Sequence, residues 1–254
     1  MFINKIYPVS YNSNPYFAKN QPERQVSSPG VQSFAMKEMP PVSMNYFNPG
    51  MDNFILGQAI NFLSEVEFSQ EDMAHMENIG VNIAFNSGKE AVDYIRDENI
   101  SIKFAPLPSL GHHAQFQEDN GQKNILINEA YSNTRNFADI LAISEAVLHE
   151  TTHAKDDDVE ASIQEEFDAL AMNALANRYH SRKYPYVFEA SSSNIVNDGV
   201  VLYSKLFFDE DPKKTALLKR IDEKYGSLPL ESPNHNLKEN SILKGYKFNT
   251  ISFQ

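Results

Sequence analysis

The sequence predicts an α+β fold, and two observations support this prediction. Between residues 81 and 128, short apolar or alternating segments bounded by turn residues indicate strands, with one amphipathic helical stretch among them. The two longest segments with helical spacing of their apolar residues follow, at about 138–155 and 159–179. We therefore expect a small group of strands together with long helices.

The chain length of 254 residues suffices for one sizeable domain with appendages. The first 50 or so residues are rich in Asn, Ser, Pro and Gln and show no sustained hydrophobic period. Such a segment buries too little apolar surface to offset its ordering entropy, so residues 1–50 are expected to form a disordered leader. We place the folded domain at 51–190, and a C-terminal helical segment and tail at 191–254.

The bulk chemistry argues against several kinds of partner and site. The net charge of -12 and the pI near 5.0 argue against nucleic acid or an anionic membrane as partner. The chain has no cysteine, which excludes disulfides, cysteine zinc sites and thiol nucleophiles. No stretch approaches the roughly 18 to 20 apolar residues of a spanning helix, and no Sec signal is recognisable. The cytoplasm is the default expectation, non-classical export stays open, and the oligomeric state is not predicted.

The first two elements are predicted as helices. Apolar residues at helical spacing follow Met51 and extend to Leu63. Ser69, with Asp72 three residues later, has the spacing of a capping box, and Gly80 is a typical residue for ending the helix that begins there.

The remaining elements follow from periodicity and turn residues. Asn120-Gly121 is typical of a tight hairpin turn, and it lies between two short strand patterns. Strands are predicted at 81–85, 100–105, 114–118 and 124–128, helices at 88–98, 138–155, 159–179 and 212–225, and a further apolar stretch at 200–208.

The segment His149-Glu150-Thr151-Thr152-His153 lies inside the most strongly predicted helix. Two histidines four residues apart project from nearly the same helix face, and both imidazoles can reach one Zn²⁺ at about 2.0 to 2.1 Å. Glu150 is displaced around the helix, so its carboxylate can meet a zinc-bound water without binding the metal. Zinc lowers the pKa of that water to about 7, the carboxylate takes the proton, and the hydroxide attacks a carbonyl. Chance also produces this pattern, in roughly one such chain in a hundred, but its place in a predicted helix favours a zinc site.

A catalytic zinc has three protein ligands, and helix phase selects the third. The apolar residues of the helix at 159–179 define its buried face, which we measure from Ile163 at about 100° per residue. Glu166 falls about 60° from this face, whereas Glu165 falls about 160° away, toward solvent. Glu160 follows His153 closely and leaves little chain to turn back. We therefore expect Glu166 to be the third ligand and Glu165 to face water; His180 and His235 are more distant candidates.

With His149-Glu150-x-x-His153 followed after a short spacer by Glu166-x-x-Ala169, the chain resembles the gluzincin branch of the zincin metallopeptidases. The runs 153–156 and 165–169 are also similar to the short-spacer peptidases of the anthrax lethal factor-like and ImmA/IrrE-like kinds. The resemblance covers about residues 81–180. It implies a Zn²⁺ cofactor, a peptide or protein substrate, and Glu150 as the catalytic base for hydrolysis of a peptide bond.

The resemblance also implies a zincin-like architecture, in which a small mixed sheet packs on the active-site helix. An antiparallel edge strand lines the cleft in such folds, and residues 124–128 are our candidate for it. This strand could receive an extended substrate by strand addition, although an ordinary sheet strand is an equal alternative.

The sequence departs from related branches at two points. Asp156 and Val159 occupy the stretch where metzincins have a Gly and a third His, so that branch is not matched. Gluzincins commonly have a Tyr or His that stabilises the oxyanion, but no spacing identifies it here. The candidates are Tyr179, His180, Tyr184 and Tyr186.

Two further sites are left open. Asp156 lies three residues past His153 and could accept the other ring N–H of a ligand histidine, but a solvated charge at the helix end explains it equally well. His112-His113 are expected in a loop before a strand, where contact with metal or substrate is the less favoured alternative.

Two alternatives to a peptidase remain. The chain could be a catalytically silent zincin-fold protein used for binding or regulation, or an acidic interaction protein without metal. Glu150 favours the peptidase, because a purely structural metal site has no need of a base at that position.

Overall fold

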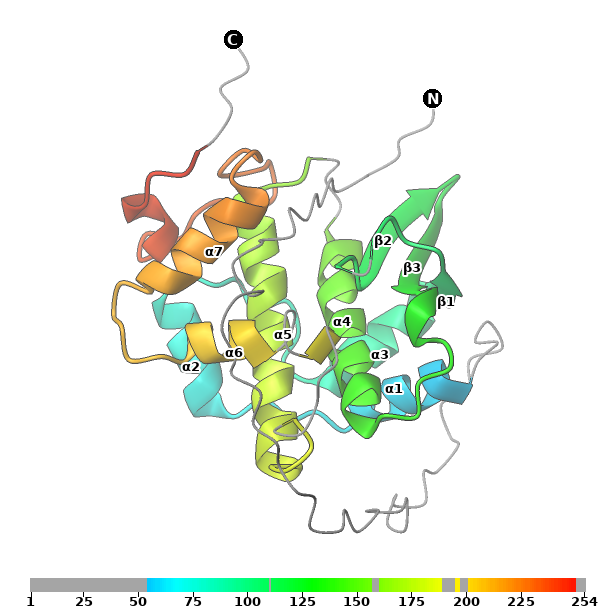
Figure 1. The fold of residues 1–254 in the computed structure, drawn as a ribbon. Coiled ribbons are helices and arrows are strands. Elements are labelled where there is room, and N and C mark those ends of the chain that lie inside the picture. The colour runs from blue at the N-terminus through cyan, green and yellow to red at the C-terminus, as the bar shows by residue number, and fades with distance from the viewer. Residues whose placement is uncertain (1–53, 110, 157–159, 189–194, 197–200, 250–254) are drawn as a thin grey trace, which may run out of the picture.

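The computed structural model describes residues 54–109, 111–156, 160–188, 195–196 and 201–249 (Figure 1). Within these ranges the chain forms seven α-helices and one mixed three-stranded sheet, so the predicted α+β class is confirmed. The predicted leader, residues 1–50, lies outside the described residues.

Three helices precede the sheet: α1 (Phe54–Ser64), α2 (Gln70–Asn78) and α3 (Gly88–Asp97). The Ser69 hydroxyl caps α2 by accepting a hydrogen bond from the Asp72 N–H, as predicted. Gly80 has φ +93°, and a Cβ there would come within 2.3 Å of the Ser241 backbone, so the position requires glycine. The strand predicted at 81–85 is wrong, because this segment joins no sheet ladder among the described residues.

The sheet consists of β1 (Ser101–Ala105), β2 (Ala114–Asp119) and β3 (Gln122–Asn128), in the order β1-β3-β2. β1 is parallel to β3, and β2 is antiparallel to it. Asn120 and Gly121 have φ of 52° and 77°, which fits the predicted tight turn between β2 and β3. The antiparallel edge strand is therefore β2, and the prediction that residues 124–128 form this edge is wrong. β3 is instead the central strand, because β1 pairs along its other edge.

The two long helices α4 (Phe137–Lys155) and α5 (Ile163–Lys183) pack against each other, and α4 lies between the sheet and α5 (Figure 1). α5 begins at Ile163, a few residues later than predicted, because Ser162 caps it by accepting from the Glu165 N–H. From Ile163 to Asn177 every residue of α5 is buried. This stretch therefore has no solvent-facing side.

The C-terminal part contributes α6 (Val201–Phe207) and α7 (Thr215–Tyr225), which pack on α5 (Figure 1), followed by the short 3-10 helix η4 (Ile242–Gly245). Side chains from these elements belong to the same hydrophobic core as the sheet and the long helices, among them Phe207, Ile221 and Leu243. In the described part of the chain, no helix combines the length and apolar character that crossing a membrane requires.

Candidate metal centre

Three side chains predicted as metal ligands converge between α4 and α5. Nε2 of His149 lies 3.2 Å from Nε2 of His153, and the Glu166 carboxylate lies 3.8 Å from the first and 3.7 Å from the second. Tetrahedral bonds of about 2.0 to 2.1 Å would separate ligand atoms by about 3.3 to 3.4 Å. Two imidazoles and a carboxylate are also the donor types that Zn²⁺ accepts, so these residues could hold the ion.

The local structure explains this convergence. The histidines stand one turn apart on α4, with ring centroids 4.9 Å apart. The capped start of α5 places Glu166 in its first turn, where the Glu166 N–H donates to the Ser162 carbonyl. The first turn of α5 thus meets the last two turns of α4.

Glu165 lies against one of the candidate ligands instead of facing water. Its carboxylate is fully buried and lies 2.8 Å from Nδ1 of His153. The prediction that Glu165 faces solvent is therefore wrong. Helix phase failed because it assumed one buried face, whereas the start of α5 is buried all round.

Asp156 does not take the position predicted from helical spacing. The backbone leaves the helix at this residue (φ -78°, ψ 126°), so the side chain does not continue the face of His153. Its carboxylate instead lies 3.4 Å from Nε2 of His235. The position at Nδ1 of His153, which the sequence left open for Asp156, is taken by Glu165.

The predicted base Glu150 is held against the edge of the sheet. Its Oε2 accepts a hydrogen bond of 2.7 Å from the backbone N–H of Phe116 in β2. Burial raises the pKa of Glu150 to about 7; the charge of His153 opposes this rise and that of Glu166 adds to it. The carboxyl group can therefore exchange a proton near neutral pH.

The two imidazoles differ in their proton affinity. Burial and the neighbouring His153 hold the pKa of His149 well below its usual range, which favours the neutral, ligand-competent form. Burial also opposes the charge of His153, but Glu166 and Glu165 outweigh it and raise its pKa to about 9. A metal ion must therefore displace a proton from His153.

A pocket opens onto these residues, and its walls come from several parts of the chain. The loop before β2, the start of β2, α4 and α5 supply most of it, and the C-terminal part supplies Tyr203, Lys224 and Tyr225. Burial raises the pKa of Glu166, and a hydrogen bond from Tyr225 opposes this rise. The charge of Lys224 opposes the rise in pKa of both Glu166 and Glu150. Sequence reasoning missed these residues, because their distance along the chain from the motif leaves no spacing signal.

The candidates predicted for oxyanion stabilisation lie elsewhere. His180 places Nδ1 2.7 Å from the buried carboxylate of Glu145, and it is not among the residues that line the pocket. Of the described tyrosines, Tyr203 and Tyr225 line the pocket, whereas Tyr179, Tyr184 and Tyr186 do not.

His112 and His113 both line the pocket at the start of β2. Nδ1 of His113 lies 2.8 Å from the Tyr131 hydroxyl, and burial lowers the pKa of this histidine to about 4. The position before a strand matches the predicted one, and His113 is neutral in the physiological range.

Comparisons of the chain with protein-family models, curated proteins and solved structures find no match.

Proposed function

We propose that this chain is a zinc-dependent peptidase with a zincin-like catalytic domain. The convergence of His149, His153 and Glu166, with Glu150 beside them at the edge of the sheet, carries this proposal. The ligand donors match a catalytic zinc with three protein ligands and one open position, and the pocket gives access to them.

Each side chain has a distinct part in the proposed reaction. Zn²⁺ held there would supply a Lewis acid that makes water nucleophilic near neutral pH and polarises a peptide carbonyl. Glu150 takes the proton of the attacking water and can return it to the leaving amine. Glu165 holds the proton of His153 on Nδ1, so that Nε2 would be free to bind the metal. Tyr203 and Tyr225 are the hydroxyl candidates for stabilising the oxyanion.

The substrate is proposed to be an extended peptide along β2. The Phe116 N–H points to Glu150 rather than to β3, and backbone groups alternate along a strand. The N–H and C=O of Ala114, two residues earlier, therefore also point away from β3, and Ala114 lines the pocket. A peptide added at this side would place its main chain beside the metal centre.

The substitution Glu150→Gln tests the proposed mechanism. The variant should bind zinc as the wild type does, because Glu150 is not a ligand, but hydrolysis of an unstructured protein substrate should fall to background. Glu71→Gln is the matched control, since this exposed glutamate lies on α2, outside both the pocket and β2, and should leave activity unchanged. Wild-type activity in Glu150→Gln would rule out this mechanism.

A catalytically silent binding protein is the second candidate. The observation that favours it is the hydrogen bond from Phe116 to Glu150, because a carboxylate tied to a strand also serves structure. In that case the wild type binds zinc but does not hydrolyse peptides, and Glu150→Gln lowers the melting temperature rather than any activity.

A further inference from the structure

Residues 229–238, here named the C-terminal strap, run along the start of α5. The carbonyl of Pro229 accepts from the Ile163 N–H at 2.9 Å, and that of Leu230 accepts from the Gln164 N–H at 3.2 Å. The first N–H groups of a helix have no partner within it, so the strap satisfies two of these donors. It is thereby attached to the turn of α5 that carries Glu166.

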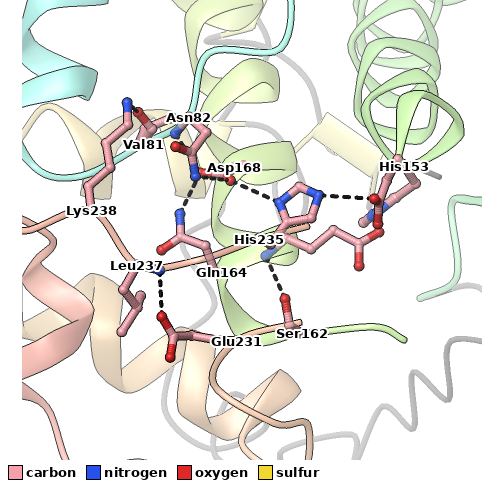
Figure 2. Close-up of polar contacts among 12 residues, drawn as sticks. Val81, Asn82, His153, Ser162, Gln164, Asp168, Glu231, His235, Leu237 and Lys238 are labelled. Carbon is pink, nitrogen blue, oxygen red and sulfur yellow. Dashed lines mark hydrogen bonds and ion pairs between the residues drawn. The ribbon is translucent and has the colours of Figure 1, made fainter. Parts of the chain in front are cut away.

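Within the strap, His235 lies between two buried carboxylates. Its Nε2 is 3.4 Å from Asp156 and its Nδ1 is 3.3 Å from Asp168. Both aspartate side chains are 1% exposed and that of His235 is 15% exposed. Figure 2 shows the imidazole of His235 beside Asp168, with His153 nearby on α4. The imidazole thus connects carboxylates from two different elements.

Asp168 is itself held firmly. Its carboxylate accepts hydrogen bonds from the backbone N–H and the side-chain amide of Asn82, at 2.8 and 2.9 Å, and from the Gln164 amide at 2.7 Å. Farther along the strap, Lys238 Nζ donates to the Val81 carbonyl at 2.6 Å (Figure 2). His235 therefore connects the end of α4 to a carboxylate that Asn82 and Gln164 already hold in place.

The two aspartates lie close in sequence to the proposed ligands. Asp156 follows His153 by three residues at the end of α4, and Asp168 follows Glu166 by two residues on α5. Any shift of one helix relative to the other changes the distance between His153 and Glu166. A side chain that joins both aspartates opposes that shift.

We propose that His235 is a positioning residue of the metal centre: by joining Asp156 to Asp168, the C-terminal strap fixes the separation of the two ligand-bearing helices and so increases zinc affinity. The inference rests on the proposed zinc site. It assigns to the strap, some seventy residues downstream of Glu166, a part in building that site.

The zinc dissociation constant, measured on the full chain by competition with a chromophoric chelator, tests this inference. We compare the wild type with His235→Gln and with Asp156→Asn, which keeps the side-chain volume. Lys238→Met is the matched control, because it removes a strap hydrogen bond that lies on the other side of His235 from His153 (Figure 2). Melting temperatures of the metal-free proteins record the loss of stability in each variant.

Outer groups that orient metal ligands contribute about 10- to 100-fold to affinity. His235→Gln and Asp156→Asn should therefore weaken zinc binding at least about tenfold and alter the visible absorption of the Co²⁺-substituted protein. Lys238→Met should change zinc affinity less than about twofold, even where its melting temperature falls.

Three results would overturn the inference. In the first, zinc affinity stays unchanged in His235→Gln and Asp156→Asn while their melting temperatures fall. In the second, Lys238→Met weakens zinc binding as much as they do. Either result makes the strap a stabilising element only. If His235→Gln does not fold, Asp156→Asn decides. A wild type that binds no zinc would remove the proposed function together with this inference, whereas failure of the variants alone removes only the inference.

Discussion

At the scale of single residues, the proposed metal centre has two adjacent glutamates in different positions. Glu165 lies 2.8 Å from Nδ1 of His153, whereas Glu166 lies 3.7 Å from Nε2 of the same ring. A carboxylate at Nδ1 fixes the proton there and leaves the lone pair of Nε2 for a metal. The proposed site therefore requires both glutamates, but only Glu166 as a ligand.

Glu166→Ala and Glu165→Ala should weaken zinc binding to different extents. Removal of Glu166 takes away a ligand, so zinc affinity should fall by far more than about 100-fold; removal of Glu165 should cost about 10- to 100-fold. Chelator competition on both purified variants measures the difference. A larger loss in Glu165→Ala would mean that Glu165 is the ligand and that the roles assigned here are reversed.

For single residues, the sequence alone predicts only those positions that local geometry sets. The pair His149 and His153 is identifiable because its geometry is set within one helix. Helix phase predicts that Glu166 lies near the histidines, which it does, but the same phase wrongly places Glu165 in solvent. Asp156 was misplaced because nothing in the local pattern showed that the backbone leaves the helix there.

At the scale of elements, the segments determined by local signals were predicted well. The cap at Ser69, the turn at Asn120-Gly121 and the long apolar periodicity of α4 all depend on neighbours in sequence. The order of the strands does not depend on such neighbours, because the central position of β3 results from its pairing with β1, which is distant in sequence. The segment 81–85 was mistaken for a strand for the same reason: its Asn82 bonds with Asp168, which is distant in sequence.

Substrate addition to β2 predicts a pattern along the peptide. Every second residue of an added strand faces β2 with its N–H and C=O. Methylation of single backbone nitrogens should therefore weaken binding at alternating positions of a cleaved peptide and have little effect between them. Inhibition constants for a series of such peptides measure this pattern. Equal losses at all positions, or none, would contradict the proposed binding mode.

At the scale of the whole molecule, the C-terminal part completes the centre. Tyr225 and Lys224 line the pocket from α7, and His235 of the strap contacts Asp156 and Asp168, which are close in sequence to the proposed ligands. α6 and α7 also share their core with α5. A sequence pattern can predict helix α7. It cannot predict that side chains of α7 lie beside a motif more than fifty residues earlier, because only folding brings the two together.

The strap also makes stability depend on pH. Burial opposes the charge of His235, but Asp156 and Asp168 outweigh it and raise its pKa to about 10, compared with about 6.5 in an unfolded chain. Its contribution to the free energy of unfolding is therefore complete below about pH 6.5 and is lost as the pH rises toward 10.

Urea unfolding of the metal-free wild type and of His235→Gln, at pH 6 and pH 9, measures this contribution. The difference in stability between the two proteins should be largest at pH 6 and smaller at pH 9. The comparison removes the titration of lysines and tyrosines, which the two proteins share. A difference that stays constant or grows with pH would show that His235 is not held in its charged form.

All the other proposals depend on zinc binding by His149, His153 and Glu166. Elemental analysis of the chain purified without an affinity tag tests it most directly. We expect about one zinc ion per chain in the wild type, lost in His149→Ala and on prolonged chelation, with a lower melting temperature once the ion is removed. A wild-type protein that contains no zinc, takes none up on addition and melts at the same temperature with and without chelator would contradict the claim.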